Sequence, residues 1–196
     1  MDGLATTARI RTLHWDAESP ELVSRMMADL DMLASDGWLI SGAVILAGTF
    51  PDSPFGSWTS DELANTWRVN LGFPFLCAQA LAPRLAEGSC LQLLLDTSLH
   101  HPWLQRLPYS AAKAGLATLV PGLAQLLAPN VRVVGHALGT LLPAEGSDAA
   151  FLAGRTLLKR IGEPADLCRA VRYAADSPFL TGEILTLDGG RRWVDR

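Results

Sequence analysis

Short apolar runs and helix-like patterns of apolar residues alternate along the whole chain. The run Leu39–Leu46 is almost continuously apolar, as expected for a strand that is covered on both faces. Before it, Leu22, Met26, Leu30 and Leu33 recur at spacings of four, four and three, which predicts one face of a helix. This alternation predicts an α/β fold in which a parallel sheet is flanked by helices.

The same patterns predict about five strands and the helices between them. The expected strands are Arg9–Trp15, Leu39–Leu46, Leu91–Leu95, Val131–Val134 and Glu183–Leu187. The first expected helix starts at Ser19-Pro20. The second runs from Ser60 to about Ala86, and Pro74 and Pro83 are expected to bend it or end it early. Two further helices are expected from Tyr109 to Ala128 and from Gly162 to about Ala175. No internal repeat or linker divides the chain, so residues 1–196 are predicted to form one domain.

The composition narrows the class of protein. The 196 residues are 49% hydrophobic and 18% charged, which excludes a disordered chain. The net charge is −4, so the sequence does not have the excess of basic residues that is typical of proteins that bind nucleic acids. The apolar runs are too short to cross a membrane. No signal segment opens the sequence, so a cytoplasmic protein is expected. His100 and His101 have no third ligand at a suitable spacing, so no metal site is predicted.

Polar residues that directly follow the apolar runs are the candidates for chemistry, because ligands of open parallel sheets bind outside the carboxyl ends of the strands. They are Asp16, Gly48-Thr49, Asp96-Thr97-Ser98 and Gly139-Thr140.

The most specific local pattern is the tyrosine–lysine pair Tyr109 and Lys113. Four residues are about one helical turn, so the phenol and the ammonium are expected on the same helix face. A nearby cation favours the phenolate and lowers the pKa of tyrosine, which makes the phenol a usable proton donor. Lys113 and Lys159 are the only lysines of the sequence. The alternative is a surface pair on an amphipathic helix.

Together with the other motifs described below, the Tyr109–Lys113 pair resembles the pattern of the short-chain dehydrogenase/reductase family. Asn70 lies in Val69-Asn70-Leu71-Gly72, where the family has an asparagine in the preceding long helix. The segment Thr181–Gly190 looks like the family's closing TG…DGG run, and Gly162–Leu167 resembles its xGxPxDL helix start. These motifs occur in the family's order, and the resemblance covers essentially residues 2–192.

The resemblance implies a Rossmann-like fold and an NADP(H) cofactor, with NAD(H) not excluded. It implies that Tyr109 donates a proton, that Lys113 lowers its pKa and holds the ribose, and that Asn70 anchors a water of the proton relay. Asp16 matches the acidic residue that holds the adenine. The cofactor-binding residues that it implies are Asp16, Ala47, Gly48, Lys113, Gly139 and Thr140.

The family's serine, thirteen residues before the tyrosine, is replaced by Asp96. A carboxylate accepts hydrogen bonds and does not donate them, so Asp96 suits a substrate that presents N–H groups. An aspartate here resembles the pteridine reductase and dihydromonapterin reductase branch of the family. The substrate-binding residues are then Asp96 and Tyr109. The alternative is an aspartate that accepts hydrogen bonds from its own loop.

Two further departures concern the cofactor. Ile45–Gly48 stands where the family has NNAG, and Leu138-Gly139 replaces its PG. No glycine-rich strand-to-helix turn precedes Asp16, although the family holds the pyrophosphate there. The chain is therefore expected to lack the family's N-terminal nucleotide-binding segment.

Two hypotheses about function follow. The first is an NADPH-dependent oxidoreductase that reduces a pteridine-like or carbonyl substrate. The second is a non-catalytic, truncated family member that acts as an oligomer partner or small-molecule binder, with the first strand paired beside Leu39–Leu46. Under either hypothesis the resemblance implies a homodimer or homotetramer, formed through the helices at 60–86 and 109–128.

Overall fold

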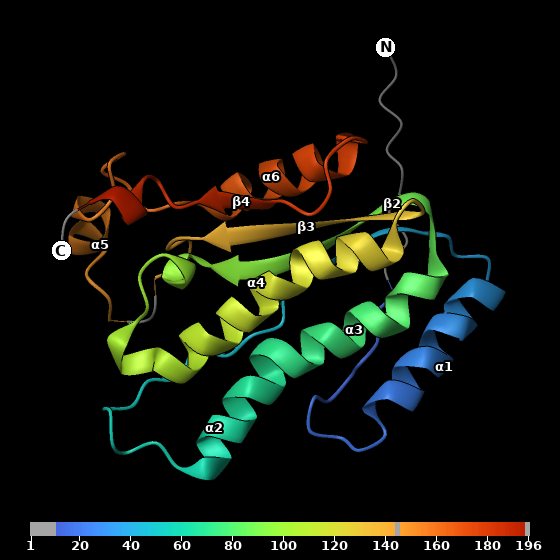
Figure 1. Ribbon diagram of the computed structural model, residues 1–196, viewed down its shortest axis with the longest axis horizontal. Helices are drawn as coiled ribbons and strands as arrows, with labels where there is room; N and C mark the ends of the chain where they lie inside the picture. Colours follow the sequence, from blue (N-terminus) through green and yellow to red (C-terminus); the bar gives the residue numbers. More distant parts are fainter. Residues whose placement is uncertain (1–10, 144–145, 195–196) are drawn as a thin grey trace.

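The computed structural model describes residues 11–143 and 146–194, which fold into a parallel sheet with helices on both faces. The strands lie side by side in chain order, and their arrowheads point to the end of the molecule where helix α5 lies (Figure 1). They are β1 (Ile40–Ile45), β2 (Leu85–Asp96), β3 (Val131–Leu138) and β4 (Ile184–Leu187). The helices are α1 (Leu22–Ser35), α2 (Ser60–Trp67), α3 (Phe73–Leu81), α4 (Leu107–Leu127), α5 (Ala149–Gly154) and α6 (Pro164–Asp176). The predicted α/β class with a Rossmann-like parallel sheet is confirmed.

Strand β2 is central because it pairs with β1 on one side and β3 on the other. Leu91, Leu93 and Leu95 alternate towards one face of the sheet and are almost fully buried. They join the core under α1, α3 and α4. On the opposite face, Cys90 and Val134 pack against Ala174 of α6. Both faces are thus covered, which explains why the strands are apolar without a regular polar alternation.

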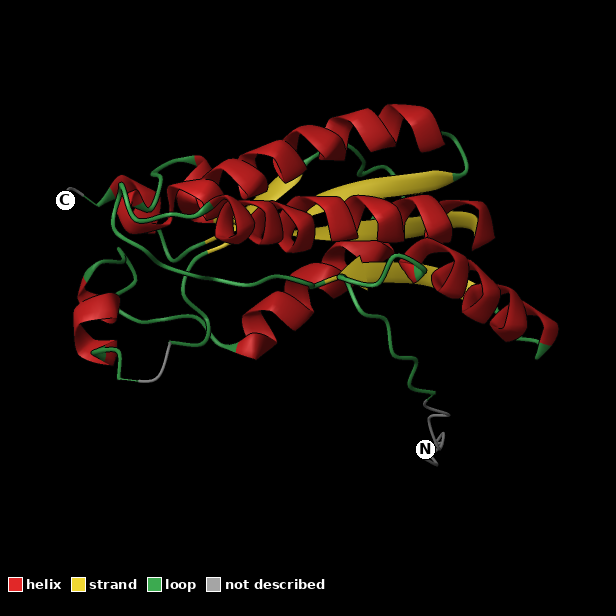
Figure 2. Cartoon of the chain, turned by 90° about the horizontal axis from the view of Figure 1, so that it is seen from below, coloured by secondary structure: helices red, strands yellow, loops and turns green. Residues whose placement is uncertain are grey.

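Helices α4, α3 and α1 lie next to one another along one face of the sheet (Figure 1). Seen from below, the strands run between helices, and the short helix α5 stands at the same end as the C-terminus (Figure 2). This end also carries the carboxyl ends of the strands, so the loops that follow β2 and β3 meet there.

The predicted long helix from Ser60 is interrupted, as its prolines indicated. Helix α2 begins at a capping box in which Thr59 accepts a hydrogen bond from the Glu62 N–H. It passes into a π-helical turn over Arg68–Gly72, immediately before Pro74 and α3. The hydrogen bonds of a π turn span one residue more than those of the α-helix, and such turns are frequent at functional sites. The turn contains Asn70, so it sets the direction of that side chain.

The predicted strand Arg9–Trp15 was wrong over the part that is described. Arg9 and Ile10 lie outside the described residues, and residues 11–15 are not in a strand. The Trp15 indole Nε1 donates a hydrogen bond to Asp29 of α1 over 2.8 Å, and its ring packs on the main core. This segment therefore lies against helix α1. Four strands are described where about five were predicted, and no described strand lies beside the free edge of β1.

Other boundaries differ by a few residues. Strand β2 begins six residues before the predicted Leu91, and its register with β1 shifts between Ile40 and Gly42. Helix α1 begins at Leu22, because the Ser19-Pro20 segment forms a turn in which Leu22 N–H bonds to the Ser19 carbonyl. Pro121 lies inside α4 without ending it. Among the described residues, no helix is both long and apolar enough to cross a membrane.

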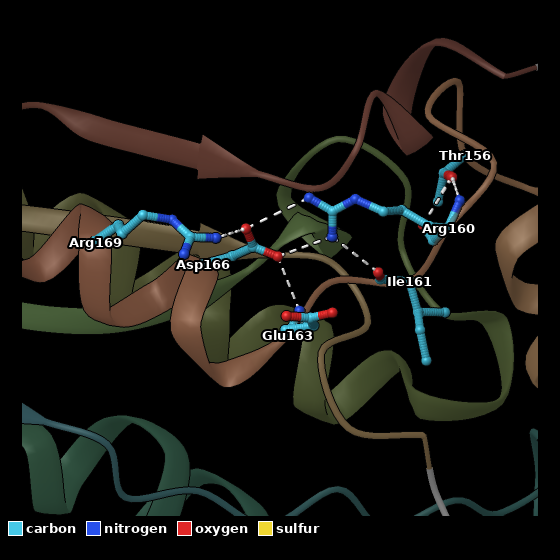
Figure 3. A network of polar contacts seen from close by, with 6 residues as sticks. All are labelled: Thr156, Arg160, Ile161, Glu163, Asp166 and Arg169. Atoms are coloured by element: carbon cyan, nitrogen blue, oxygen red, sulfur yellow. Dashed lines mark hydrogen bonds and ion pairs between the residues drawn. The ribbon is translucent and has the colours of Figure 1, made fainter.

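The start of α6 is held by a compact polar network around Asp166 (Figure 3). The Asp166 carboxylate accepts a hydrogen bond from the Glu163 N–H over 2.9 Å and is paired with Arg160 and Arg169. These contacts, with Arg160 first, lower the pKa of Asp166. The predicted helix start at Gly162-Glu163-Pro164 is therefore confirmed, and the network fixes the loop that follows α5.

Candidate active site

Four polar side chains predicted from the sequence come together at the carboxyl end of the sheet. Asp96 ends β2, Tyr109 and Lys113 lie one turn apart on α4, and Asn70 comes from the π turn between α2 and α3. Tyr109, Lys113 and Asn70 are 7%, 4% and 0% exposed. Buried polar groups of this kind need hydrogen-bond partners, and each finds at least one in its neighbours.

Tyr109 and Asp96 are in direct contact. The phenol donates a hydrogen bond to Asp96 Oδ2 over 3.1 Å. Burial raises the pKa of Tyr109, and the charge and hydrogen bond of Asp96 raise it further. The expectation of a lowered pKa is not met here, because burial and the Asp96 carboxylate both raise the pKa of Tyr109.

Asp96 also accepts a hydrogen bond from its own loop, which was the alternative prediction for this residue. Its Oδ1 accepts the Ser98 N–H over 2.6 Å, as an aspartate that shapes its own loop would. The same oxygen accepts the Trp103 indole N–H over 3.0 Å. The carboxylate therefore both fixes its loop and faces the phenol, and it acts as an acceptor in all three contacts.

Lys113 is a buried cation with spare donors. Its Nζ donates to the Leu94 carbonyl over 3.0 Å and lies 5.7 Å from the centroid of the Tyr109 ring. Burial lowers the pKa of Lys113 to about 8, against the opposing effect of Asp96. An ammonium has three N–H donors, and Leu94 is its only hydrogen-bond partner in the described part of the chain. Two donors therefore remain for hydroxyl groups of a ligand.

Asn70 ties the loop after β1 to the helical layer. Its Oδ1 accepts the Thr49 N–H over 3.2 Å, and its Nδ2 donates to Thr49 Oγ1 and to the Thr66 carbonyl over 3.2 and 3.0 Å. The amide is thus satisfied on both sides. In this structure the side chain positions the loop, and its Oδ1, which accepts one hydrogen bond, keeps a second lone pair; the role of Asn70 in a proton relay stays a prediction.

Gly48 marks the closest approach of this loop to the other groups. A Cβ atom at Gly48 would lie 3.0 Å from Asn70 Oδ1 and 3.6 Å from Lys113 Nζ. The first distance is tighter than an ordinary contact, so glycine at this position allows the backbone to approach Asn70 this closely. Ala47 precedes it in the same half-buried loop. The spare N–H donors of Lys113, close to the backbone of Gly48, fit the ribose hydroxyls of a dinucleotide.

The remaining predicted cofactor residues are not brought to this cluster. Asp16 is exposed, and its carboxylate accepts the Glu18 N–H in the turn before α1. Gly139 packs against the chain near the C-terminus, since a Cβ there would lie 2.8 Å from Asp188 Cα. The Thr140 carbonyl accepts the Gly162 N–H, and Thr140 lines a cavity on the α6 side of the loop. Their cofactor roles stay predictions.

Three residues of this region were missed by sequence reasoning. The ring of Phe50, 47% exposed, meets Tyr109 edge-on with 4.7 Å between centroids. Trp103 bonds to Asp96, and the Arg191 guanidinium lies 4.6 Å from the centroid of the Trp103 ring. Phe50 follows Gly48-Thr49 closely and Arg191 directly follows the closing Asp188-Gly189-Gly190 motif, so both had a usable signal, whereas Trp103 lies in a loop without a motif. No group of three or more metal-binding side chains occurs in residues 11–143 and 146–194.

Comparison with known proteins agrees with this arrangement. Residues 2–192 match the family model described as enoyl-(acyl carrier protein) reductase. The fold and this match together define a Rossmann-type α/β domain. The chain belongs to the short-chain dehydrogenase/reductase family.

Individual relatives are more distant. The chain is 41% identical over 135 residues to carbonyl reductase family member 4 of Danio rerio, a match that covers 67% of this chain and 57% of that protein. It is 30% identical over 144 residues to dihydromonapterin reductase of Escherichia coli, covering 69% and 60%. The matches thus span less than two thirds of these relatives. A dehydrogenase/reductase structure from Sinorhizobium meliloti superposes with a TM-score of 0.81 at 25% identity, covering 90% of this chain and 72% of that one.

Proposed function

We propose that the chain carries the catalytic side of an NADPH-dependent reductase whose substrate is a flat, pteridine-like compound with N–H donors. The observation that supports this most is that Tyr109, Asp96, Lys113 and Asn70 lie together where the backbone of Gly48 comes close to Asn70 and Lys113. Each side chain comes from a different element or helical turn, so local structure alone does not explain why they meet.

Each side chain has a role that its contacts support. When bound, NADPH supplies a hydride to a carbon of the substrate C=N or C=O bond. Tyr109 gives its phenolic proton to the nitrogen or oxygen of that bond and recovers a proton from solvent. The Lys113 ammonium donates its free N–H groups to ribose hydroxyls. Asn70 positions the loop after β1, which brings Gly48 close to Lys113.

The substrate class rests on Asp96 and Phe50. A plain ketone offers only an acceptor oxygen, and a carboxylate gives it no donor. An amino-substituted heteroaromatic ring offers N–H donors to Asp96, whose Oδ2 faces the phenol. The half-exposed ring of Phe50, edge-on to Tyr109, gives such a ring an aromatic neighbour.

The protein is further proposed to act as a homodimer or homotetramer. An apolar groove along α2 and α4 is lined by side chains that include Phe55, Trp67 and Leu107. These side chains are 90%, 45% and 39% exposed. An exposed apolar groove on two neighbouring helices suits a second copy of the same surface.

The test compares a dihydropterin with a simple aromatic ketone as substrates, with NADPH oxidation as the readout. The proposal predicts turnover of the dihydropterin and at least about 10-fold lower kcat/KM for the ketone. A preference for the ketone would replace the pteridine-like class by a carbonyl substrate. Absence of turnover with NADPH bound would favour the non-catalytic, ligand-binding alternative.

A further inference from the structure

A small cationic pocket lies beside the proposed active site, on the other side of Trp103. Its volume is about 210 Å³, and its lining includes Thr97, His101, Trp103, Arg155, Arg191 and Arg192. Trp103 connects the pocket to the site, because its indole N–H bonds to Asp96. Such a volume is smaller than that of a pocket for a whole drug-sized ligand. It suits one functional group of a molecule that also reaches Asp96.

The arginines of the pocket come from two separate loops. Arg155 follows α5, and Arg191 follows the turn Asp188-Gly189-Gly190. Gly189 and Gly190 have φ values of 60° and 79°, a left-handed conformation that favours glycine. The turn directs Arg191 onto the face of Trp103, with 4.6 Å to the ring centroid. Burial, and next the positive charge of Arg155, lower the pKa of Arg191, while Asp96 and Asp188 oppose this effect.

Two hydrogen-bond donors of the pocket lack an acceptor. Arg191 Nη1 and Arg192 Nε are buried and have no hydrogen-bond partner among the described residues. The ion pairs found within residues 11–143 and 146–194 all involve other arginines. A buried cationic donor without a partner carries a desolvation cost that an anion would offset.

The carboxylates nearest to the pocket are already engaged. Asp96 accepts hydrogen bonds from Ser98, Trp103 and Tyr109. Asp188 accepts the backbone N–H groups of Gly190 and Arg192. Among the described residues, the three guanidiniums outnumber the two nearby carboxylates, whose oxygens accept from other donors, so the described lining is net positive.

We infer that this pocket binds an oxyanion group, a carboxylate or a phosphate, of the substrate. The substrate is then an acidic molecule whose reducible bond lies at Tyr109 while its anionic group lies at Arg191. Guanidinium groups bind such oxyanions through paired N–H donors. The statement about the substrate rests on the proposed function, whereas anion binding by the pocket does not.

Anion binding is tested on the full chain with malonate and with inorganic phosphate, followed by tryptophan fluorescence and by the shift in Tm. The inference predicts saturable binding to the wild type, weakened about 10- to 100-fold in Arg191→Gln and unchanged in Arg172→Gln. Arg172 is an exposed arginine of α6 that does not line the pocket, so it is the matched control. The tighter of the two anions identifies the oxyanion class.

Loss of binding must be separated from loss of fold. Arg191→Gln removes a buried N–H group without an acceptor together with the contact on Trp103, and these opposing effects are expected to leave the Tm of the ligand-free variant near that of the wild type. Arg155→Gln provides a second variant with the same expectation. No saturable response to either anion, or equal binding by Arg191→Gln and Arg172→Gln, would overturn the inference.

Failure of the inference and failure of the proposed function give different results. Tyr109→Phe should bind the anions as the wild type does, whether or not the chain is a reductase. If NADPH-dependent turnover occurs but a substrate acid and its amide have equal KM, the function stands and the anion subsite does not. If anions bind without any turnover, the pocket stands and the reductase does not.

Discussion

The phenol of Tyr109 donates a hydrogen bond to Asp96 Oδ2 over 3.1 Å. The proposed proton donor is therefore bonded to the carboxylate that is proposed to accept N–H groups of the substrate. The pair is also buried, and both effects raise the pKa of Tyr109. Transfer of the proton to a substrate therefore requires a ligand that takes the place of this contact. A substrate N–H at Asp96 and an acceptor atom at Tyr109 would do so together.

Replacement of Tyr109 by phenylalanine removes the proton donor and leaves the ring. Reductase turnover is expected to fall by about 10²- to 10⁴-fold, the usual contribution of a positioned acid. The other tyrosine, Tyr173 on α6, is 59% exposed, and Tyr173→Phe is the matched control. NADPH oxidation measured for both variants should separate them; equal turnover would exclude Tyr109 as the donor.

Asp96→Ser exchanges an acceptor for a group that can also donate. The substitution is expected to raise KM for a dihydropterin about 10-fold or more and to improve turnover of a simple ketone. Steady-state kinetics with both substrates measure this change. The account would be contradicted by a serine variant that keeps the wild-type ratio of kcat/KM values.

The buried ammonium of Lys113 should make stability depend on pH in a defined window. Its pKa is about 8 in the folded chain and about 10.4 when exposed, so between these values the unfolded chain binds more protons. Stability therefore rises with pH across this window, by up to about 1.4 kcal/mol per pH unit. Tyr109, Cys77 and Cys90, whose pKa values are raised, act in the opposite direction at alkaline pH.

A comparison of variants isolates the lysine contribution from those opposing groups. Urea unfolding of the wild type, Lys113→Met and Lys159→Met at several pH values gives the difference directly. Wild type should gain stability relative to Lys113→Met as pH rises from 8 towards 10, whereas Lys159→Met should follow the wild type. Parallel curves for all three chains would show that Lys113 titrates normally.

Asn70→Ala removes the hydrogen bonds that fix the loop after β1. Loss of these buried contacts should lower the free energy of unfolding by about 1–3 kcal/mol and weaken cofactor binding. Asn65→Ala in α2 is the control, because the Asn65 Oδ1 has no hydrogen-bond partner among the described residues. Denaturant unfolding tests this effect, and equal stability of the two variants would speak against it.

The parts of the fold and site that could be predicted are those that depend on local spacing. The apolar run around β1 and the one-turn spacing of Tyr109 and Lys113 reflect the periods of strand and helix, so a sequence reveals both. Asp96 was found because it directly follows the apolar run of β2.

What could not be predicted depends on contacts between distant segments. The π turn at Asn70 arises where a helix must continue past Pro74, and its exact residues are not encoded by periodicity. The stacking of Arg191 on Trp103 joins loops almost ninety residues apart. The raised pKa of Tyr109 was missed because it depends on burial and on the contact with the Asp96 carboxylate, which only the folded chain reveals.

Titration of the chain with NADPH, followed by fluorescence of the nicotinamide, tests the central claim most directly. Saturable enhancement is predicted for the wild type and for Lys159→Met, with loss of about 10-fold or more in affinity for Lys113→Met. No response from the wild type, or the same affinity in both lysine variants, would contradict a nicotinamide site beside Tyr109.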